Sequence, residues 1–210
     1  PILLSKWYDA EQGINFGINP AISSWEDQKG SDNLSQGTAS LQPTLVSAVL
    51  NGKDIVRFDG IQQFMDVIYA AGITQPTTIM IVCNPNNDLG TVNLFDGIGG
   101  SDRHTLFING SEDYAIFAGT TLSSTTTRDN AFVTLRVEFN GATSKIFRNG
   151  VEIASGNAGT QDMDGFTLGA RNDGAQNCQL DVATVLIFDG LLTAQQVTDM
   201  QNYINTEYGI

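Results

Sequence analysis

The stretch Gln179-Leu-Asp-Val-Ala-Thr-Val-Leu-Ile-Phe188 decides the fold class of this chain. β-Branched and aromatic residues dominate it and turn residues flank it, so it predicts a strand that is buried on much of both faces. A shorter strand is expected just before it, at residues 166–171. A helix is expected after it, because Thr193 and Gln196 have the spacing of a capping box.

The expected helix runs from Thr193 to Tyr208 and ends at Gly209, a residue typical of helix C-termini. Its apolar residues recur at helical spacing: Val197, Met200, Ile204 and Tyr208. A single helix that ends a chain of strands must cover apolar surface, and we predict that it covers the rim or edge of a β-sandwich.

Short strand patterns separated by turn signals occupy the rest of the sequence. Strands are predicted at residues 2–10, 46–50, 55–58, 77–84, 91–95, 105–109, 114–117, 132–139, 144–148 and 151–154, with an edge segment at 64–67 and a loop at 123–127. Asn51-Gly52 is a strong hairpin signal between two of them. Many short strands at this spacing predict an all-β fold, a two-sheet antiparallel jelly-roll sandwich that forms one domain over residues 1–210.

The strand at 132–139 shows the alternation that a sandwich requires, with one face toward the core and one toward solvent. The predicted inward residues are Val133, Leu135, Val137 and Phe139, and the predicted solvent-facing residues are Thr134, Arg136 and Glu138.

The C-terminal motif Val182-Ala-Thr-Val-Leu-Ile-Phe-Asp189, followed by Leu192-Thr193 and by a helix that ends Tyr-Gly, resembles the concanavalin A-like lectin/glucanase superfamily, and most closely its laminin-G-like branch. Trp25-x-Asp27 and Phe58-Asp59-Gly60 are similar to further motifs of that family. The resemblance implies a jelly roll whose first strand pairs near the last ones, and function through surface recognition.

Two positions depart from the resembled pattern, since Thr184 replaces a glutamate and Lys29 replaces a serine. Trp25 is expected in the core, with ligand stacking as the alternative, because large aromatic side chains are mostly buried. Asp27 and Asp59 are expected to accept hydrogen bonds within turns, and a calcium ligand is the alternative for Asp59.

The composition limits the possible partners. The 210 residues include 10 Lys and Arg against 23 Asp and Glu, a formal net charge of -13, and the basic residues are scattered. Such a surface disfavours nucleic acid and suits calcium, cationic partners or uncharged ligands. No apolar run reaches the ~20 residues of a membrane span, so membrane insertion is not expected.

Cys83 and Cys178 are predicted to be buried free thiols, with one disulfide between the sheets as the alternative. Residues 1–6 do not read as a signal peptide. We therefore expect either a removed signal or a protein released with a particle, and a location outside the cell or on a particle surface.

Catalytic motifs are not recognisable, so we expect a protein that is not an enzyme. The Glu-x-Asp-x-x-Glu pattern of glucanases does not occur, and the acid pairs at 26–27, 112–113, and 162 with 164 lie in predicted turns. His104 is the single histidine and is expected to cap a strand. The glycines at 97, 99 and 100 form a turn and not a dinucleotide fingerprint.

Ligand binding is instead expected at loops, since loops carry specificity in folds of this kind. The candidate rim consists of turn residues at strand ends: Asp96, Asp102, Arg103, Asp113, Asn172 and Asp173. The alternative is that these residues only form turns. No cofactor is required, Ca²⁺ is possible, and no metal ligands are assigned.

The predicted function is lectin-like binding of a glycan or protein ligand at a particle or cell surface. The alternative is a structural decoration protein of a virion, such as a phage capsid or tail, that contacts other subunits. A glycan-active enzyme is the third possibility.

Overall fold

Strand β17 (Gln179–Asp189) is the centre of the fold, as its apolar sequence predicts. A computed structural model describes residues 4–86, 90–128 and 130–210, and in it the β17 residues between the two ends are all buried. Val185 and Ile187 face the core between two sheets, whereas Leu186 and Phe188 face the C-terminal helix α1 (Ala194–Tyr208). The prediction of burial on both faces is confirmed.

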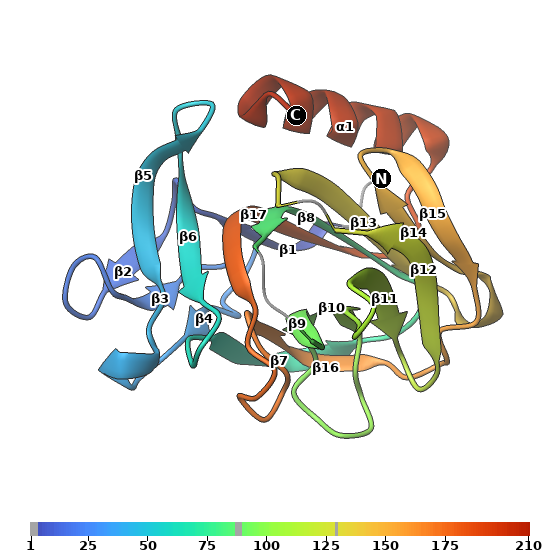
Figure 1. The fold of residues 1–210 in the computed structure, drawn as a ribbon, viewed down its shortest axis with the longest axis horizontal. Coiled ribbons are helices and arrows are strands. Elements are labelled where there is room, and N and C mark those ends of the chain that lie inside the picture. Colours follow the sequence, from blue (N-terminus) through green and yellow to red (C-terminus); the bar gives the residue numbers. More distant parts are fainter. Residues whose placement is uncertain (1–3, 87–89, 129) are drawn as a thin grey trace.

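The two sheets are antiparallel and stack face to face (Figure 1). Sheet A contains, in spatial order, β15 (Val151–Gly156), β14 (Ser144–Arg148), β13 (Val133–Phe139), β8 (Thr77–Pro85), β17, β6 (Lys53–Asp59) and β5 (Thr44–Leu50), and β1 (Leu4–Asp9) also pairs with β17. Sheet B contains β12 (Thr121–Thr127), β11 (Asp113–Phe117), β10 (Thr105–Ile108), β9 (Val92–Asp96), β16 (Met163–Leu168), β7 (Met65–Ile73), β4 (Leu34–Ser35), β3 (Ile22–Trp25) and β2 (Ile14–Phe16). Two 3-10 turns lie at Ala39–Leu41 and Gly141–Thr143.

Aromatic side chains fill the space between the sheets. Trp25 is fully buried, and its indole Nε1 donates a hydrogen bond to the Asp9 carbonyl at 2.9 Å, so its predicted place in the core is confirmed. Phe166 of β16 packs against Phe95 of β9, with ring centroids 5.1 Å apart. Such pairs add packing energy beyond the area that they bury.

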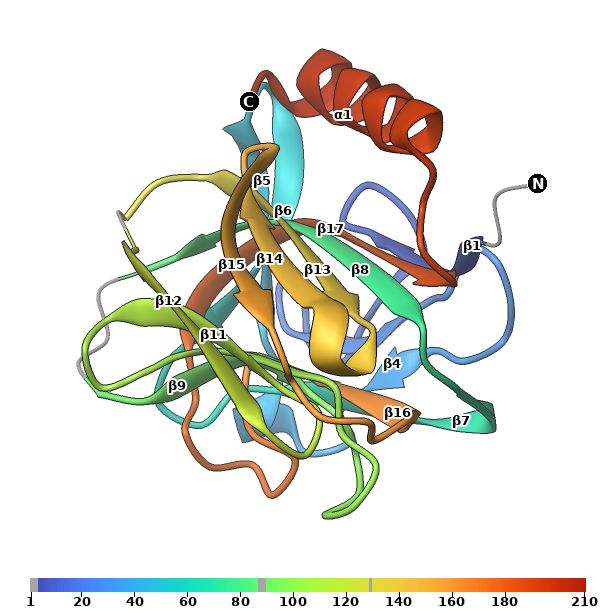
Figure 2. The same ribbon diagram turned by 90° about the vertical axis from the view of Figure 1, so that its right-hand side faces the viewer.

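Helix α1 lies on the outer face of sheet A and not at the rim, which corrects the prediction. Figure 2 shows it above the layer that holds β8, β13 and β17, on the far side from β7, β9 and β16. There Ile204 and Tyr208 pack against outward-facing residues of sheet A such as Ile55 and Met80. The physical reason is that sheet A carries apolar side chains on its outer face, and these need cover.

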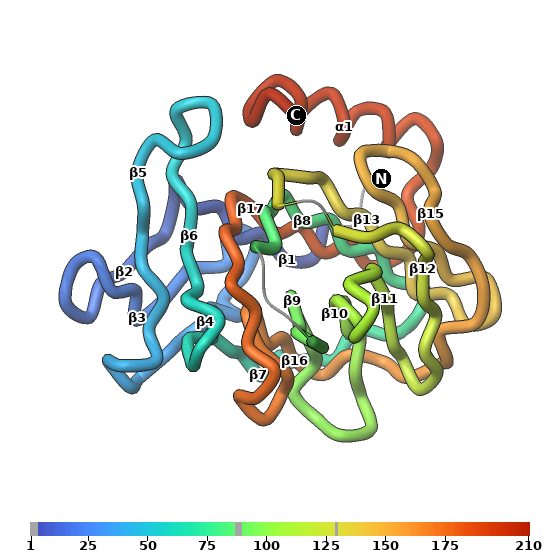
Figure 3. Tube along the Cα trace, in the orientation of Figure 1, coloured from blue at the N-terminus to red at the C-terminus, as the bar shows by residue number. Residues whose placement is uncertain are grey.

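The tip of the β5–β6 hairpin holds the end of the helix. Figure 3 shows this tip beside the C-terminal end of α1, where the Asn51 amide donates a hydrogen bond to the Glu207 carbonyl at 3.1 Å. Gly209 ends the helix in the left-handed conformation, with φ of 71°. Both the Asn51-Gly52 hairpin and the glycine stop are confirmed.

The start of α1 gives a testable prediction. The Gln196 backbone N–H donates to the Thr193 hydroxyl, and the Thr193 N–H donates to the Gln196 side chain. Replacing Thr193 with Ala is expected to lower the free energy of unfolding by about 1 kcal/mol, because the cap is lost. Urea denaturation measures this.

Thr198→Ala is the matched control, since Thr198 is an exposed threonine inside the same helix. Its change should stay within about 0.5 kcal/mol. Equal losses in the two variants would contradict the capping role.

Three strand predictions are wrong. Residues 123–127 belong to β12 and not to a loop, because β-branched threonines suit an edge strand whose polar side chains face water. Residues 65–67 of the expected edge segment 64–67 lie at the start of β7, which is an interior strand between β16 and β4. The strand expected at 166–171 occupies Met163–Leu168, since Gly169 turns the chain with φ of 87°.

The face assignment of β13 is half correct. The four predicted inward residues are buried in the core. Thr134 and Arg136 are also buried, against the prediction, because the outer face of sheet A is covered too. The Arg136 guanidinium lies 3.5 Å from the centre of the Phe147 ring and also pairs with Glu138.

Cys83 and Cys178 are free and buried, so the predicted thiols are confirmed and the disulfide alternative is wrong. Burial raises the pKa of the Cys83 thiol well above its usual value, so this thiol stays protonated and unreactive. Among the residues that the structure describes, no helix has both the length and the apolar character to cross a membrane.

Candidate functional site

Polar and aromatic side chains come together in a cleft on the outer face of sheet B. Along β10, Leu106 and Ile108 point into the core, so Thr105 and Phe107 point outward. The cleft has a volume of about 220 Å³. It is lined by Thr91, Asn93, Arg103, Thr105, Phe107, Phe117, Arg171 and Gln176.

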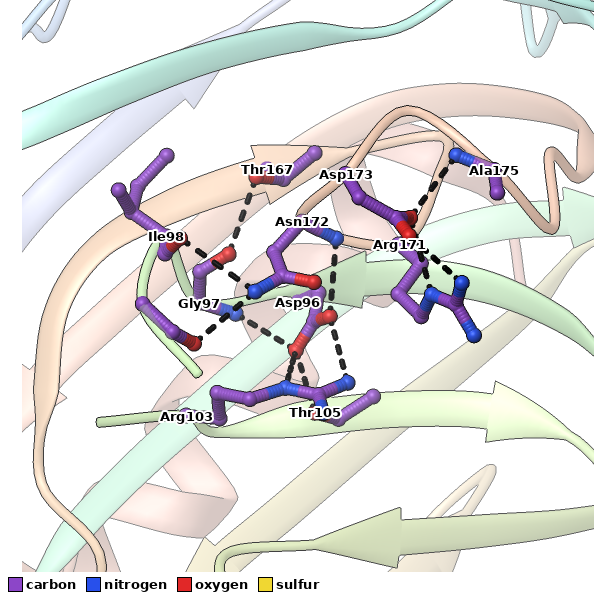
Figure 4. Close-up of polar contacts among 11 residues, drawn as sticks. Asp96, Gly97, Ile98, Arg103, Thr105, Thr167, Arg171, Asn172, Asp173 and Ala175 are labelled. Atoms are coloured by element: carbon purple, nitrogen blue, oxygen red, sulfur yellow. Dashed lines mark hydrogen bonds and ion pairs between the residues drawn. The ribbon is translucent and has the colours of Figure 1, made fainter. Parts of the chain in front are cut away.

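Asp96, at the end of β9, is hydrogen-bonded to the cleft residues Arg103 and Thr105 (Figure 4). Its carboxylate has no exposed surface and accepts hydrogen bonds from Nε and Nη2 of Arg103 at 2.9 and 2.7 Å. It also accepts from the Thr105 hydroxyl at 2.5 Å and from the backbone N–H groups of Gly97 and Asn172 at 2.9 and 3.0 Å. A buried carboxylate with this many hydrogen-bond donors is a fixed anchor, because donors from separate segments hold it in one position.

The turn between β9 and β10 is hydrogen-bonded to the end of β16 and to the loop that follows it. The Asn172 amide nitrogen donates to the carbonyl of Gly99 at 3.0 Å, and the Thr167 hydroxyl donates to the carbonyl of Gly97 at 3.0 Å. Figure 4 shows both contacts beside Asp96. The two segments are therefore held together, although they are far apart in sequence, and each carries one arginine of the cleft, Arg103 or Arg171.

Arg171 supplies a second guanidinium. Its Nε and Nη2 donate to the two carboxylate oxygens of Asp173 at 2.9 and 2.6 Å. The Arg171 guanidinium, with help from the Ala175 N–H, holds the pKa of Asp173 at about 2, below its usual value. Arg171 N also donates to the Ala175 carbonyl at 2.8 Å, which closes this loop on itself.

Two phenylalanines provide the apolar part of the cleft. Phe107 and Phe117 are half-buried, so part of each ring faces the cleft. The Arg103 guanidinium carbon lies 5.3 Å from the centre of the Phe117 ring, within the range of a cation–π contact. Arg103 is thus held from two directions.

The structure brings together most of the predicted rim. Asp96, Arg103 and Asn172 are in direct contact, and Asp173 joins them through Arg171. Asp102 lies in the same β9–β10 turn and accepts a hydrogen bond from the Ser101 hydroxyl at 3.1 Å. Whether these residues bind a ligand stays a prediction.

Asp113 does not belong to this site. It begins β11 beside Asn109, and its carboxylate accepts a hydrogen bond from the Thr127 hydroxyl at 3.1 Å. Since Thr105 pairs with Phe117 and Ile108 with Tyr114, Asp113 lies at the opposite end of the β10–β11 hairpin. Antiparallel pairing places successive turns at opposite ends of a hairpin, and the sequence prediction ignored this.

Several lining residues were missed by the sequence analysis: Thr91, Asn93, Thr105, Phe107, Phe117, Arg171 and Gln176. The alternation along residues 105–108 was a usable signal, because it places Thr105 and Phe107 on one face. Asp96 was chosen as a contact for ligands, but it is fully buried and supports Arg103 instead.

His104 is an interior residue and not a strand cap. Its ring has no exposed surface and stacks on Phe139, with centroids 4.2 Å apart and planes at 10°. Its Nε2 lies 2.8 Å from the Gln161 carbonyl oxygen. Burial lowers the pKa of His104 to about 4, so the ring is neutral near pH 7.

The turn roles of two acids are confirmed. Asp59 Oδ1 accepts hydrogen bonds from the backbone N–H groups of residues 61, 62 and 63, and Asp27 Oδ1 accepts from Trp7 and Lys29. Within the described ranges no group of three or more His, Cys, Asp and Glu side chains is arranged to hold a metal ion. Calcium binding stays a prediction.

The fold and the cleft together define a jelly-roll sandwich with a polar and aromatic cleft on one outer face. The chain belongs to the concanavalin A-like lectin/glucanase superfamily, whose family model matches residues 68–198. The resemblance found in the C-terminal sequence is therefore confirmed. No curated protein matches the sequence significantly.

Solved structures share this fold at low sequence identity. The binding domain of Paraclostridial Mosquitocidal Protein 1 superposes with a TM-score of 0.69 at 14% identity, over 97% of this chain and 52% of that one. A chain of botulinum neurotoxin type C, whose cell entry depends on interaction with two ganglioside molecules, superposes with a TM-score of 0.68 at 13% identity, over 96% of this chain and 51% of that one. Trypanosoma rangeli sialidase in complex with sialic acid superposes with a TM-score of 0.67 at 14% identity, over 94% of this chain and 32% of that one.

The chain thus spans about half of the toxin chains and about a third of the sialidase. At these identities the similarity establishes the fold alone. Binding domains and enzymes both contain it.

Proposed function

We propose that this chain is a noncatalytic recognition module that binds a glycan in the cleft on sheet B. The observation that carries the proposal is the combination of ring surfaces from Phe107 and Phe117 with polar groups from Asn93, Arg103 and Gln176 in one cleft. Sugars present apolar C–H faces together with hydroxyl groups, so a site for them needs both kinds of surface.

The comparisons support a glycan partner. One structural neighbour is described by its interaction with ganglioside molecules, and another is the binding domain of a toxin. The same likeness supports a place outside the cell or on a particle surface, where such partners occur.

The lining of the cleft supports a noncatalytic role. None of the described residues that line it is Asp or Glu. Glycosidases mostly use two carboxyl groups roughly 5 to 9.5 Å apart across the scissile bond. The two carboxylates bonded to lining residues are both engaged by arginines, Asp96 by Arg103 and Asp173 by Arg171, and Asp96 is also fully buried.

A glycan array, run with and without calcium, tests this proposal. Wild-type protein should bind a defined subset of glycans, and Phe107→Ala should weaken binding to that subset about tenfold or more, because a central aromatic contact is lost. Phe16→Ala is the control, since Phe16 is 40% exposed on β2, far along sheet B from β10. This control should bind like wild type.

Three results would contradict the proposal. If no glycan binds with or without calcium, and the protein copurifies with a multimeric shell, the alternative role as a structural protein of a virion would be favoured. Without that result this role stays a prediction. Equal binding by Phe107→Ala and wild type would place the site elsewhere. Release of sugar from any array glycan would favour an enzyme.

A further inference from the structure

We propose that the cleft selects acidic sugars and binds their carboxylate or sulfate group with Arg103 and Arg171. This inference rests on the proposed function and specifies its ligand class. The shared chemistry is a planar or tetrahedral oxyanion on a sugar ring.

The distribution of charge in the cleft is the first argument. The chain has 10 basic residues against 23 acidic ones, yet the cleft is lined by two arginines and by no acid among the described residues. The other lining side chains are neutral. Each guanidinium is paired with one carboxylate, Asp96 or Asp173, so the cleft is close to neutral and repels an anion less than the acidic overall composition would suggest.

The geometry of the ion pairs is the second argument. Each arginine donates hydrogen bonds from Nε and Nη2 to one carboxylate: Arg103 to Asp96, and Arg171 to Asp173. A guanidinium has five N–H donors, and this two-point pairing uses two of them. The two N–H groups of Nη1 and one N–H of Nη2 on each arginine therefore remain available to a ligand. No further hydrogen bond from these donors occurs among the described residues, and both side chains line the cleft.

Preorganisation is the third argument. The Arg103 side chain is 20% exposed and is fixed by Asp96 and by Phe117. Arg171 is 36% exposed and is fixed by Asp173. Held guanidiniums lose little conformational freedom on binding, and paired donors recognise carboxylate and sulfate oxygens well.

The net charge of -13 does not prevent such binding. The Debye length is about 8 Å at physiological ionic strength, so distant surface carboxylates are largely screened. Contacts within the cleft then decide the affinity.

The test compares acidic glycans with matched neutral ones by titration calorimetry. The probes are 3′-sialyllactose against lactose, a glucuronate disaccharide against its carboxyl-reduced form, and 6-sulfated lactose against lactose. At least one acidic probe should bind about tenfold more tightly than its neutral counterpart. The pair that responds distinguishes a carboxylate from a sulfate.

Arg171→Gln should abolish the preference for the acidic member of the pair while the fold is kept, because an exposed ion pair adds little stability. Arg103→Gln is less suitable, since it would leave the buried carboxylate of Asp96 without its cationic partner. Lys53→Gln is the control: it also removes one positive charge and breaks a surface ion pair, with Glu207, but lies on β6 in sheet A. Circular dichroism and urea denaturation check the fold of each variant.

Equal affinity for acidic and neutral members of every pair would overturn the inference and leave the proposed function intact. An unchanged preference in Arg171→Gln would also overturn it. Silence of the glycan array with wild-type protein would overturn both the proposed function and this inference.

Discussion

Asp96→Ala is expected to lower the free energy of unfolding by about 3–5 kcal/mol, because it leaves the largely buried guanidinium of Arg103 without its carboxylate partner. Asp96 has no exposed surface and forms two hydrogen bonds with Arg103. Its removal also leaves the Thr105 hydroxyl and two backbone N–H groups without their acceptor. Urea denaturation at constant pH measures the loss.

Asp102→Ala is the matched control, since Asp102 is an acid of the same turn whose side chain accepts only from the Ser101 hydroxyl in the described structure. Its stability should change by no more than about 0.5 kcal/mol. Asp96→Asn should lie between the two, because it keeps the shape and loses the charge. Similar losses for Asp96→Ala and Asp102→Ala would show that Asp96 is an ordinary turn residue.

Acid is expected to destabilise the protein through His104. Burial lowers the pKa of this ring to about 4, so the folded state binds the proton less well than the unfolded state, whose pKa is about 6.5. Stability is therefore complete above about pH 6.5 and falls as the pH drops toward 4, by about 3 kcal/mol in total. The neighbouring charge of Asp162 raises this pKa and opposes the effect of burial only in part.

His104→Phe isolates this contribution. A phenyl ring keeps the stacking on Phe139 and cannot titrate. The free energy of unfolding of wild type minus that of the variant should rise by about 3 kcal/mol between pH 4 and pH 7.5. Asp9 and Asp66, whose pKa values are raised by burial, affect both proteins equally and cancel in the difference. Parallel pH curves for the two proteins would refute the assignment.

Local patterns predicted most of the strands because their causes are local, but the short strands β2, β3 and β4 were not predicted. The hairpin at Asn51-Gly52 and the capping box at Thr193 are set by nearby residues, and both are present. The position of α1 was mispredicted because it depends on which face of sheet A is apolar, and this requires the register of several strands. Residues 123–127 were mispredicted because an edge strand of threonines has the composition of a loop.

The site was harder to predict because its parts come from three separate segments. Asp96 and Asn172 were both chosen as turn residues, and the structure joins them across 76 positions of sequence. Phe107 was overlooked, although the alternation along residues 105–108 places it on the outward face with Thr105. Asp113 was included because strand ends were not assigned to opposite sides of the hairpin.

The central claim is that the cleft over β9 and β10 holds the glycan. Backbone amide chemical shifts, recorded while a glycan from the array is added, test it most directly. The account predicts that the largest changes fall on Asn93, Arg103, Thr105 and Phe107, which line the cleft. Changes centred instead on Trp7 and Tyr203, which line an apolar groove beside α1, would contradict it.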